Sequence, residues 1–267
     1  MTERFFKYHA LGNDFVVLDR RQGGGDISAQ TSREWCDRRR GIGADGVLTI
    51  LPEAGTAGRM VVHNADGSIA EMCGNGIRCV VKYLAEHSGD QPRSLEVATG
   101  AGVLRNEIDW ADGHVSTVTV QMGPARLTDR NLPKAPEVTI DGVTGTPISM
   151  GNPHLVLLDT PPSEATKLGA KLELSPLFPE RTNVEFCRPR AAGGIEVTVW
   201  ERGVGLTQAC GTGACAAVAA HTLKGRVPFD AWVPVELPGG VLQINVRKDL
   251  GQVLLRGPAT LVFDGEL

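Results

Sequence analysis

Short runs of apolar and β-branched residues recur along the chain and predict many strands. The stretch 114–122 alternates apolar and polar residues and follows Asp112-Gly113, a pair typical of a hairpin turn. Gly193-Gly194 and Gly239-Gly240 indicate turns before two of the later strands. The other runs that predict strands are residues 15–19, 47–51, 60–64, 154–159, 195–201 and 241–247.

Three segments have helical patterns. Residues 32–40 predict a polar surface helix that stops at Gly41. After Gly76, apolar residues recur at the i, i+3, i+4 and i+7 positions, which predicts a helix with one apolar face that can end at Gly89. After Gly213 the residues are small and apolar on nearly all sides, so this helix is expected to be enclosed by other elements. Many strands around few helices favour a mixed α/β fold.

The chain contains two similar halves. "MCGNGIRC" (72–79) and "ACGTGACA" (209–216) each place a cysteine directly before a glycine-rich turn and a helix. Self-similarity of this kind indicates two homologous domains, each contributing one cysteine to a shared cleft. We expect residues 1–121, with a returning segment 259–267, to form one half and residues 122–258 to form the other. The matching pairs are Cys73 with Cys210, Asn13 with Asn152, and Asn64 with Glu201.

A cysteine at the start of a helix suggests acid–base chemistry. The unpaired N–H groups and positive dipole end of a helix bind anions such as carboxylate and favour thiolate. Lowering a thiol pKa from about 8.5 to about 7 takes roughly 2 kcal/mol, and a partly buried helix end supplies up to ~2 kcal/mol. Two such thiols on opposite faces of a carbon could remove a proton on one face and deliver one on the other.

Composition restricts the class of protein. The chain has 267 residues and six cysteines. Its formal net charge of −4 argues against nucleic acid or an anionic membrane as the main partner. Neither a signal peptide nor an apolar run of the ~20 residues that span a bilayer is recognised in the sequence. A reduced cytoplasmic enzyme is therefore expected. Four cysteines are interpreted as small core residues: Cys36, Cys79, Cys187 and Cys215.

Seven motifs follow one another along the chain: "HALGNDFVV" (9–17), "HNADGS" (63–68), "MCGNGIRC" (72–79), "MGNPH" (150–154), "RTNVEF" (181–186), "WERGVGLTQACGTGACA" (200–216) and "LPGG" (237–240). They resemble the motifs of the diaminopimelate epimerase family, in the same order. The resemblance implies an α/β fold of two pseudo-symmetric domains, each a mostly antiparallel curled sheet around a central helix. It implies interconversion of LL- and meso-2,6-diaminopimelate for lysine and peptidoglycan precursor synthesis, without pyridoxal phosphate or metal, in a homodimer.

The resemblance also implies roles for individual residues. Cys73 and Cys210 correspond to the catalytic pair, and His154 and Glu201 to residues that adjust the pKa values of the thiols. A guanidinium pairs well with a carboxylate, and amide oxygens can accept from an ammonium group. The carboxylate clamp is expected at Gly74, Asn75, Gly211 and Thr212, and the substrate ligands at Asn13, Asn64, Asn152, Asn183, Glu201 and Arg202.

Two positions depart from the family pattern. Gly46 stands where some members have a glutamine that contacts substrate, so that contact is not expected here. Phe263 stands where some members have a tyrosine linked to dimer formation, which leaves the dimer less firmly implied.

The sequence also contains patterns of other protein classes, of which a dinucleotide-binding protein is rejected and the others remain alternatives. "GIGADG" (41–46) matches a dinucleotide-binding pattern, but a helix precedes it and a strand follows, the reverse of what that motif needs. The cysteine spacings in "CGNGIRC" and "CGTGAC" do not fit close zinc-ligand pairs, although a metal-binding or redox thiol protein is an alternative. The nearest enzymatic alternative is a cofactor-independent racemase similar to proline racemase.

Overall fold

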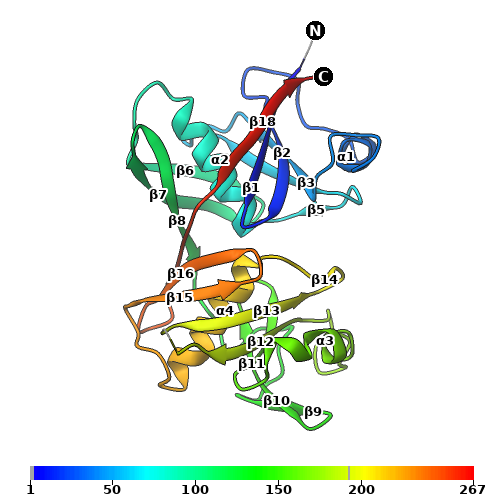
Figure 1. The fold of residues 1–267 in the computed structure, drawn as a ribbon, viewed down its shortest axis with the longest axis vertical. Helices are drawn as coiled ribbons and strands as arrows, with labels where there is room; N and C mark the ends of the chain where they lie inside the picture. The colour runs from blue at the N-terminus through cyan, green and yellow to red at the C-terminus, as the bar shows by residue number, and fades with distance from the viewer. Residues whose placement is uncertain (1–2, 192) are drawn as a thin grey trace. The chain divides into compact units, whose positions relative to one another are not determined.

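The structure, a computed structural model, describes residues 3–191 and 193–267 (Figure 1). The chain divides into two compact units, and the first comprises Met1–Val120 with Gly257–Leu267. Its helices are α1 (Ala29–Cys36) and α2 (Gly74–Glu86). Its strands are β1 (Arg4–Ala10), β2 (Asn13–Asp19), β3 (Gly46–Leu51), β4 (Arg59–Asn64), β5 (Ile69–Ala70), β6 (Ser94–Thr99), β7 (Gly102–Ala111), β8 (His114–Gly123) and the returning β18 (Thr260–Glu266).

The second unit comprises Gln121–Arg256. Its helices are the short η1 (Pro162–Glu164), α3 (Ala165–Glu173) and α4 (Gly211–Leu223). Its strands are β9 (Val138–Ile140), β10 (Val143–Ser149), β11 (Pro153–Leu157), β12 (Asn183–Pro189), β13 (Ile195–Glu201), β14 (Gly205–Leu206), β15 (Trp232–Leu237), β16 (Gly240–Val246) and β17 (Val253–Gly257).

The two units have the same topology. In the first, β1 and β2 form an antiparallel pair, β2 runs parallel to β3, β3 is antiparallel to β4, and β4 runs parallel to β6. In the second, β10 to β13 and β15 repeat these pairings in the same order and direction. The β6–β7–β8 and β15–β16–β17 meanders also match. The expected pair of pseudo-symmetric, mostly antiparallel domains is therefore confirmed.

Each unit wraps its strands around one central helix. α2 contacts β1, β2, β3, β4 and β6, and α4 contacts β10, β11, β12, β13, β15 and β16. α4 is enclosed as its small apolar residues predict, with Ala214 through Ala220 at zero exposure. The prediction of a single buried face for α2 was too narrow, because Arg78 and Lys82 on its other faces are buried as well. Their charged ends are satisfied by hydrogen bonds to Gly74 O and Val115 O.

A second helix covers the other face of the sheet in each unit. In the first unit, Cys36 of α1 packs with Val16, Leu18 and Val47. In the second, Leu172 of α3 packs in the same way on the core side chains Leu155, Leu157, Val184 and Phe186. Because successive strand residues alternate between faces, His154 and Glu185 point to the opposite side, where α4 lies. This alternation sets up the polar site described below.

Most predicted strands are present with ends shifted by one or two residues, and one helix is placed differently. The polar helix expected at 32–40 is α1, which begins at Ala29 and ends at Cys36. Ser28 caps it by accepting a hydrogen bond from Thr31 N, and the carboxylate of Asp37 then accepts from the amides of Arg39 and Arg40 in a turn. The side chain of Asp37 therefore competes with continued helix, as short acidic residues do at helix ends.

The predicted turns have the backbone geometry that the sequence suggests. Asp112 and Gly113 both have positive φ values, 51° and 80°, and join β7 to β8 in a two-residue hairpin. Gly193 and Gly194 are also left-handed, at 87° and 79°. In the part of the chain that the structure describes, no helix is long and apolar enough to cross a membrane.

Candidate active site

Both motif cysteines occupy the N-cap position of a central helix. Cys73 caps α2 with extended backbone (φ −137°, ψ 114°), and its Sγ accepts from Gly76 N at 3.4 Å. Cys210 caps α4 with nearly the same backbone (φ −120°, ψ 112°). Cysteine is not among the residues preferred at this position, which are Ser, Thr, Asp and Asn. Each sulfur therefore lies at the positive end of a helix, beside amide groups that have no partner within the helix.

The surroundings of Cys210 do not favour thiolate, contrary to the expectation from its helix end. Burial raises the pKa of the Cys210 thiol well above its usual value, and the Glu201 carboxylate raises it further. Burial also raises the pKa of Glu201, whose Oε1 accepts from Thr207 Oγ1 at 2.6 Å. Loss of solvation therefore outweighs the helix dipole at this site. Cys210 is held as a thiol next to a carboxylate that can accept its proton.

A chain of polar contacts links the start of α4 to the sheet below it. Cys210 Sγ lies 3.5 Å from Thr212 Oγ1, and Asn152 Nδ2 lies 3.5 Å from the same oxygen. Asn152 Oδ1 is 3.0 Å from Nε2 of the fully buried His154. The other ring nitrogen, Nδ1, is 2.7 Å from Oε1 of Glu185. Four of the predicted residues thus form one connected group.

Asn183 and Arg202 are joined by the backbone. Asn183 Oδ1 accepts from the amide of Arg202 at 3.0 Å, and Asn183 Nδ2 donates to Pro153 O at 2.9 Å. The guanidinium of Arg202 donates to Glu180 O at 3.1 Å and is otherwise exposed. Asn183 is also the partner of His154 in the parallel β11–β12 ladder. Asn183 and Arg202 are therefore placed by the end of the β11–β12 ladder that also carries His154.

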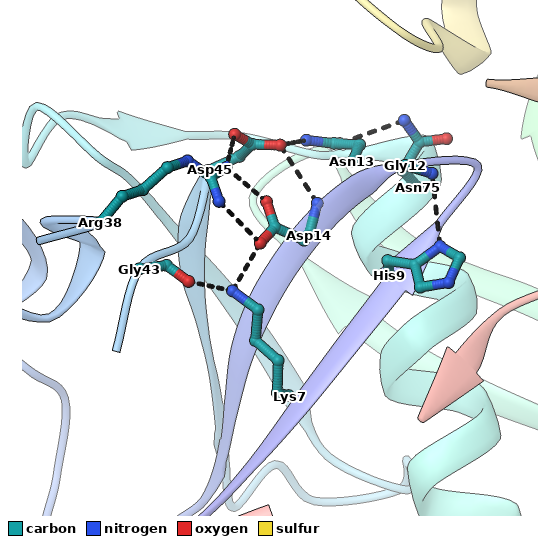
Figure 2. A network of polar contacts seen from close by, with 9 residues as sticks. All are labelled: Lys7, His9, Gly12, Asn13, Asp14, Arg38, Gly43, Asp45 and Asn75. Carbon is teal, nitrogen blue, oxygen red and sulfur yellow. Dashed lines mark hydrogen bonds and ion pairs between the residues drawn. The ribbon is translucent and has the colours of Figure 1, made fainter. Parts of the chain in front are cut away.

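The first half holds an equivalent group of amides. Asn75 Nδ2 donates to Asn13 Oδ1 at 3.1 Å, and Asn13 Nδ2 donates to Asp45 Oδ2 at 2.8 Å (Figure 2). On the other side, Asn75 Oδ1 accepts from the buried guanidinium of Arg78 at 3.0 Å. Asn75 is the second residue after Cys73, as Thr212 is the second after Cys210. The contact between Asn13 and Asn75 is therefore the counterpart of that between Asn152 and Thr212.

Charged residues behind Asn13 fix the position of Asp45. Arg38 donates to both Asp14 and Asp45 at 2.7 Å, and Lys7 donates to Asp14 and to Gly43 O (Figure 2). Partial burial alone would raise the pKa of Asp14, but the hydrogen bonds from Arg38 and Lys7 hold this pKa at about 2. Asp14 is therefore charged, and Arg38, which pairs with both acids, holds Asp45 in place behind the Asn13 amide.

The two asparagines are held in opposite orientations. The group behind Asn13 is a carboxylate, which can only accept, so Asn13 turns its NH₂ group inward and its oxygen toward α2. Asn152 instead turns its oxygen to His154 and its NH₂ group toward α4. An oxygen suits an ammonium group and an NH₂ group suits a carboxylate. The two halves thus offer different chemistry at matching positions.

The backbone around Gly46 leaves no room for the glutamine that some family members have at this position. Gly46 pairs with Asn64 across the β3–β4 ladder, and a Cβ added to it would lie 2.6 Å from His63 O. Such a distance is too short for any side chain, so the strands close over the space that a glutamine would need. Asn64 itself bonds to Ser68 through both its backbone amide and its side chain, and it is exposed at the end of β4.

Sequence reasoning missed Asp45, Arg78 and Glu185. Asp45 was noticed only as part of a rejected nucleotide-binding pattern, and Arg78 lies on an expected surface face of α2. Glu185 had a usable signal, because it is a lone acidic residue between Val184 and Phe186 in an apolar strand. The four cysteines expected in the core are all buried free thiols.

The orientation of Asn13 should depend on Asp45. In Asp45→Asn the new amide can present NH₂ to Asn13, so the Asn13 oxygen is no longer held toward α2. We expect KM for substrate to rise about tenfold, as for loss of one well-placed hydrogen bond to a charged group. The change in free energy of unfolding should be about 1 kcal/mol or less, since the Arg38–Asp45 pair is exposed. Steady-state kinetics and thermal unfolding measure both, and an unchanged KM would contradict the assignment.

Sequence comparison with known proteins shows the family of this chain. The family description "Diaminopimelate epimerase" matches residues 5–128 and 146–262. The chain is 46% identical to the diaminopimelate epimerase of Desulforudis audaxviator, over 98% of both chains, and 45% identical to that of Magnetococcus marinus, over 100% of this chain and 98% of the relative.

A structural relative has the same fold at low sequence identity. The structure of a probable proline racemase from Agrobacterium radiobacter superposes with a TM-score of 0.75 at 15% identity, covering 99% of this chain and 92% of its own. At this identity the likeness concerns the fold. The family is shown by the sequence matches, which extend over the whole chain. The chain belongs to the diaminopimelate epimerase family.

Proposed function

We propose that the protein interconverts LL- and meso-2,6-diaminopimelate by moving a proton at one α-carbon, with Cys73 and Cys210 as the two acid–base groups. The observation that carries the proposal is the pair of central helices, each capped by a cysteine with the same backbone conformation, in units of identical topology. Inversion at carbon needs two such groups of similar acidity, one to remove a proton and one to supply it.

The α-carboxylate of the substrate would bind at the helix starts. The first amides of α2 belong to Gly74 and Asn75, and those of α4 to Gly211 and Thr212. Removing the α-proton spreads negative charge onto the carboxylate, and N–H groups already directed at it stabilise that charge in the transition state. The helix ends thus act on the substrate more than on the resting thiols.

Cys210 would rest as the proton donor, because burial and Glu201 raise its pKa. When the reaction runs in the opposite direction, Cys210 must first lose its proton, and Glu201 is the adjacent carboxylate that can take it. Bound substrate excludes water from the Cys210 thiol, which already caps α4, and this strengthens the electrostatic interactions of the thiol with the helix dipole. His154 serves this step by holding Asn152 in place.

The distal end of diaminopimelate carries an ammonium and a carboxylate. Arg202 and the NH₂ groups of Asn152 and Asn183 are suited to a carboxylate, whereas the oxygens of Asn13, Asn64 and Glu201 are suited to ammonium. Proline has no charged arm for these groups to bind. This set is the feature that favours diaminopimelate over the proline racemase alternative, although both would share one fold.

The proposal is tested by turnover of purified protein with LL-diaminopimelate and, separately, with L-proline. Loss of optical rotation or separation of the epimers by chromatography measures the reaction without a coupling enzyme. We expect turnover of diaminopimelate alone, with no pyridoxal phosphate or metal added and with no loss on treatment with chelator. Turnover of proline and not of diaminopimelate would contradict the proposal and support a racemase similar to proline racemase.

We further propose a cytoplasmic homodimer in which the two units, residues 1–121 with 259–267 and residues 122–258, are the catalytic halves. An exposed apolar row on β18, formed by Leu261, Val262 and Phe263, supports a contact between two copies. Phe263 is anchored edge-on to Phe5 at 6.0 Å between ring centroids, so it can fill the place of the family's tyrosine without a hydroxyl. Sedimentation equilibrium distinguishes dimer from monomer.

A further inference from the structure

Glu185 is a buried acid that the mechanism above does not use. It lies in the middle of β12 with no exposed surface, and its Oε2 has no hydrogen-bond partner among the described residues. Burial raises the pKa of its carboxyl group, and His154 acts in the opposite direction. A buried ion pair of this kind seldom adds stability relative to apolar residues of similar size. Its presence under the start of α4 therefore points to a role in the site.

Glu185 is packed directly beneath the first turn of α4. A Cβ added at Gly213 would lie 3.0 Å from Glu185 Oε1 and 3.3 Å from Cys210 Sγ. A side chain at Gly213 would therefore crowd both the carboxylate and the sulfur. The same Oε1 is 2.7 Å from His154 Nδ1. Glu185 thus contacts His154 from the sheet side of α4, and it would affect bound substrate only through the histidine.

The protons of this group can be assigned from its partners. Asn152 Oδ1 can only accept, so His154 Nε2 must carry a hydrogen. One more proton lies between His154 Nδ1 and Glu185 Oε1. Whether this proton is bound to Nδ1 or to Oε1, the His154–Glu185 pair has no net charge and His154 Nε2 still donates a hydrogen bond. A neutral histidine without this acid could carry its hydrogen on Nδ1 instead, which would leave Nε2 to repel the Asn152 oxygen.

We propose that Glu185 is a positioning residue that keeps His154 Nε2 protonated and thereby holds Asn152 with its NH₂ group turned toward the start of α4. The effect passes through two contacts, Glu185 to His154 and His154 to Asn152, at 2.7 Å and 3.0 Å. This proposal rests on the proposed function only for the identity of the substrate that Asn152 would bind. In the first half Asp45 orients Asn13 directly, whereas here the histidine inserted between acid and asparagine reverses the amide.

The kinetic test compares Glu185→Gln with wild type. We expect KM to rise about tenfold with a smaller change in kcat, because Asn152 no longer donates reliably to bound substrate. The defect should shrink as pH falls, since a protonated His154 again has Nε2–H. The ionisable groups that face His154 and its neighbours are Glu185 on β12, Glu201 at the end of β13 and Cys210 at the start of α4. A loss of folding alone would give no such recovery.

The matched control is Glu86→Gln, the same change at an acid of α2 that accepts from Lys82 and from Val115 N. This variant should keep the KM and pH profile of wild type. A KM in Glu185→Gln equal to that of wild type, or a defect that does not change with pH, would overturn the proposal.

A second measurement needs no activity. In protein labelled with ¹⁵N-histidine and free of substrate, the ring of His154 should show a hydrogen on Nε2 at neutral pH. In Glu185→Gln the ring should populate the tautomer with its hydrogen on Nδ1 as well. A bare Nε2 in wild-type protein overturns the proposal even if the variant fails to fold. Because the spectrum is recorded without substrate, it also separates this proposal from the choice of substrate.

Discussion

Replacing either Cys73 or Cys210 by alanine is expected to reduce epimerisation by about 10⁴-fold, the upper end of the contribution of one general acid–base group. Each cysteine caps a different helix, so neither can take over the other's face of the substrate carbon. Alanine keeps the backbone and removes only the sulfur. The measurement is the initial rate in both directions, starting from LL- and from meso-diaminopimelate.

The chain provides matched controls for this experiment. Cys79 and Cys215 lie in the same two helices and are fully buried free thiols. Cys79→Ala and Cys215→Ala remove the same atom from α2 and α4 and should leave turnover near that of wild type, at a cost of about 1 kcal/mol in the free energy of unfolding. If Cys73→Ala or Cys210→Ala turned over as fast as these controls, the two-thiol mechanism would be wrong.

Mild oxidation should stop catalysis completely by joining Cys73 to Cys210. If the two sulfurs act on opposite faces of one carbon, as proposed, an oxidant can join them when no substrate stands between them. Such a disulfide requires Cα atoms within roughly 7 Å of each other. Thiol reductant should restore activity, because a disulfide lies on the reversible part of the cysteine oxidation series. Substrate should protect by standing between the sulfurs.

Peptide mapping of the oxidised protein identifies the bond. The expected product is a single crosslink between the peptides that contain Cys73 and Cys210, with the four core thiols unchanged. Cys36→Ala is a suitable background control, since this thiol is buried in the α1 core and outside both motifs. A different pairing, or inactivation with both motif thiols free, would show that the two sulfurs do not serve one substrate.

Much of the fold was predictable because its signals are local. A strand that ends in a turn, a cysteine and a glycine-rich helix start can be recognised within about 20 residues, and its recurrence indicates duplication. The enclosed nature of α4 follows from "ACAAVAAHTL", where no position could face water without exposing an apolar surface. Asn13, Asn64 and Asn152 each precede or end a strand that the sequence predicts, but their expected roles as ligands rest on the family resemblance.

The remaining features depend on contacts between distant segments. Glu185 meets His154 from 31 positions away, and Asp45 meets Asn13 from 32 positions away, through parallel strand pairs that a pattern of single residues does not specify. Arg78 is buried because its guanidinium finds Pro258 O from the returning segment, 180 positions later. The raised pKa of Cys210 likewise follows from burial and from Glu201 together. None of these effects can be read from helix position alone.

Hydrogen isotope exchange during the first few per cent of reaction tests the central claim most directly. When LL-diaminopimelate reacts in heavy water, the thiol on the product face exchanges with solvent before it delivers its hydrogen. The account therefore predicts that the early meso product carries deuterium at the inverted carbon, while the recovered LL substrate carries none. Early product that retains the substrate's own hydrogen, or equal labelling of both epimers from the start, would indicate a single base and contradict the pairing of Cys73 with Cys210.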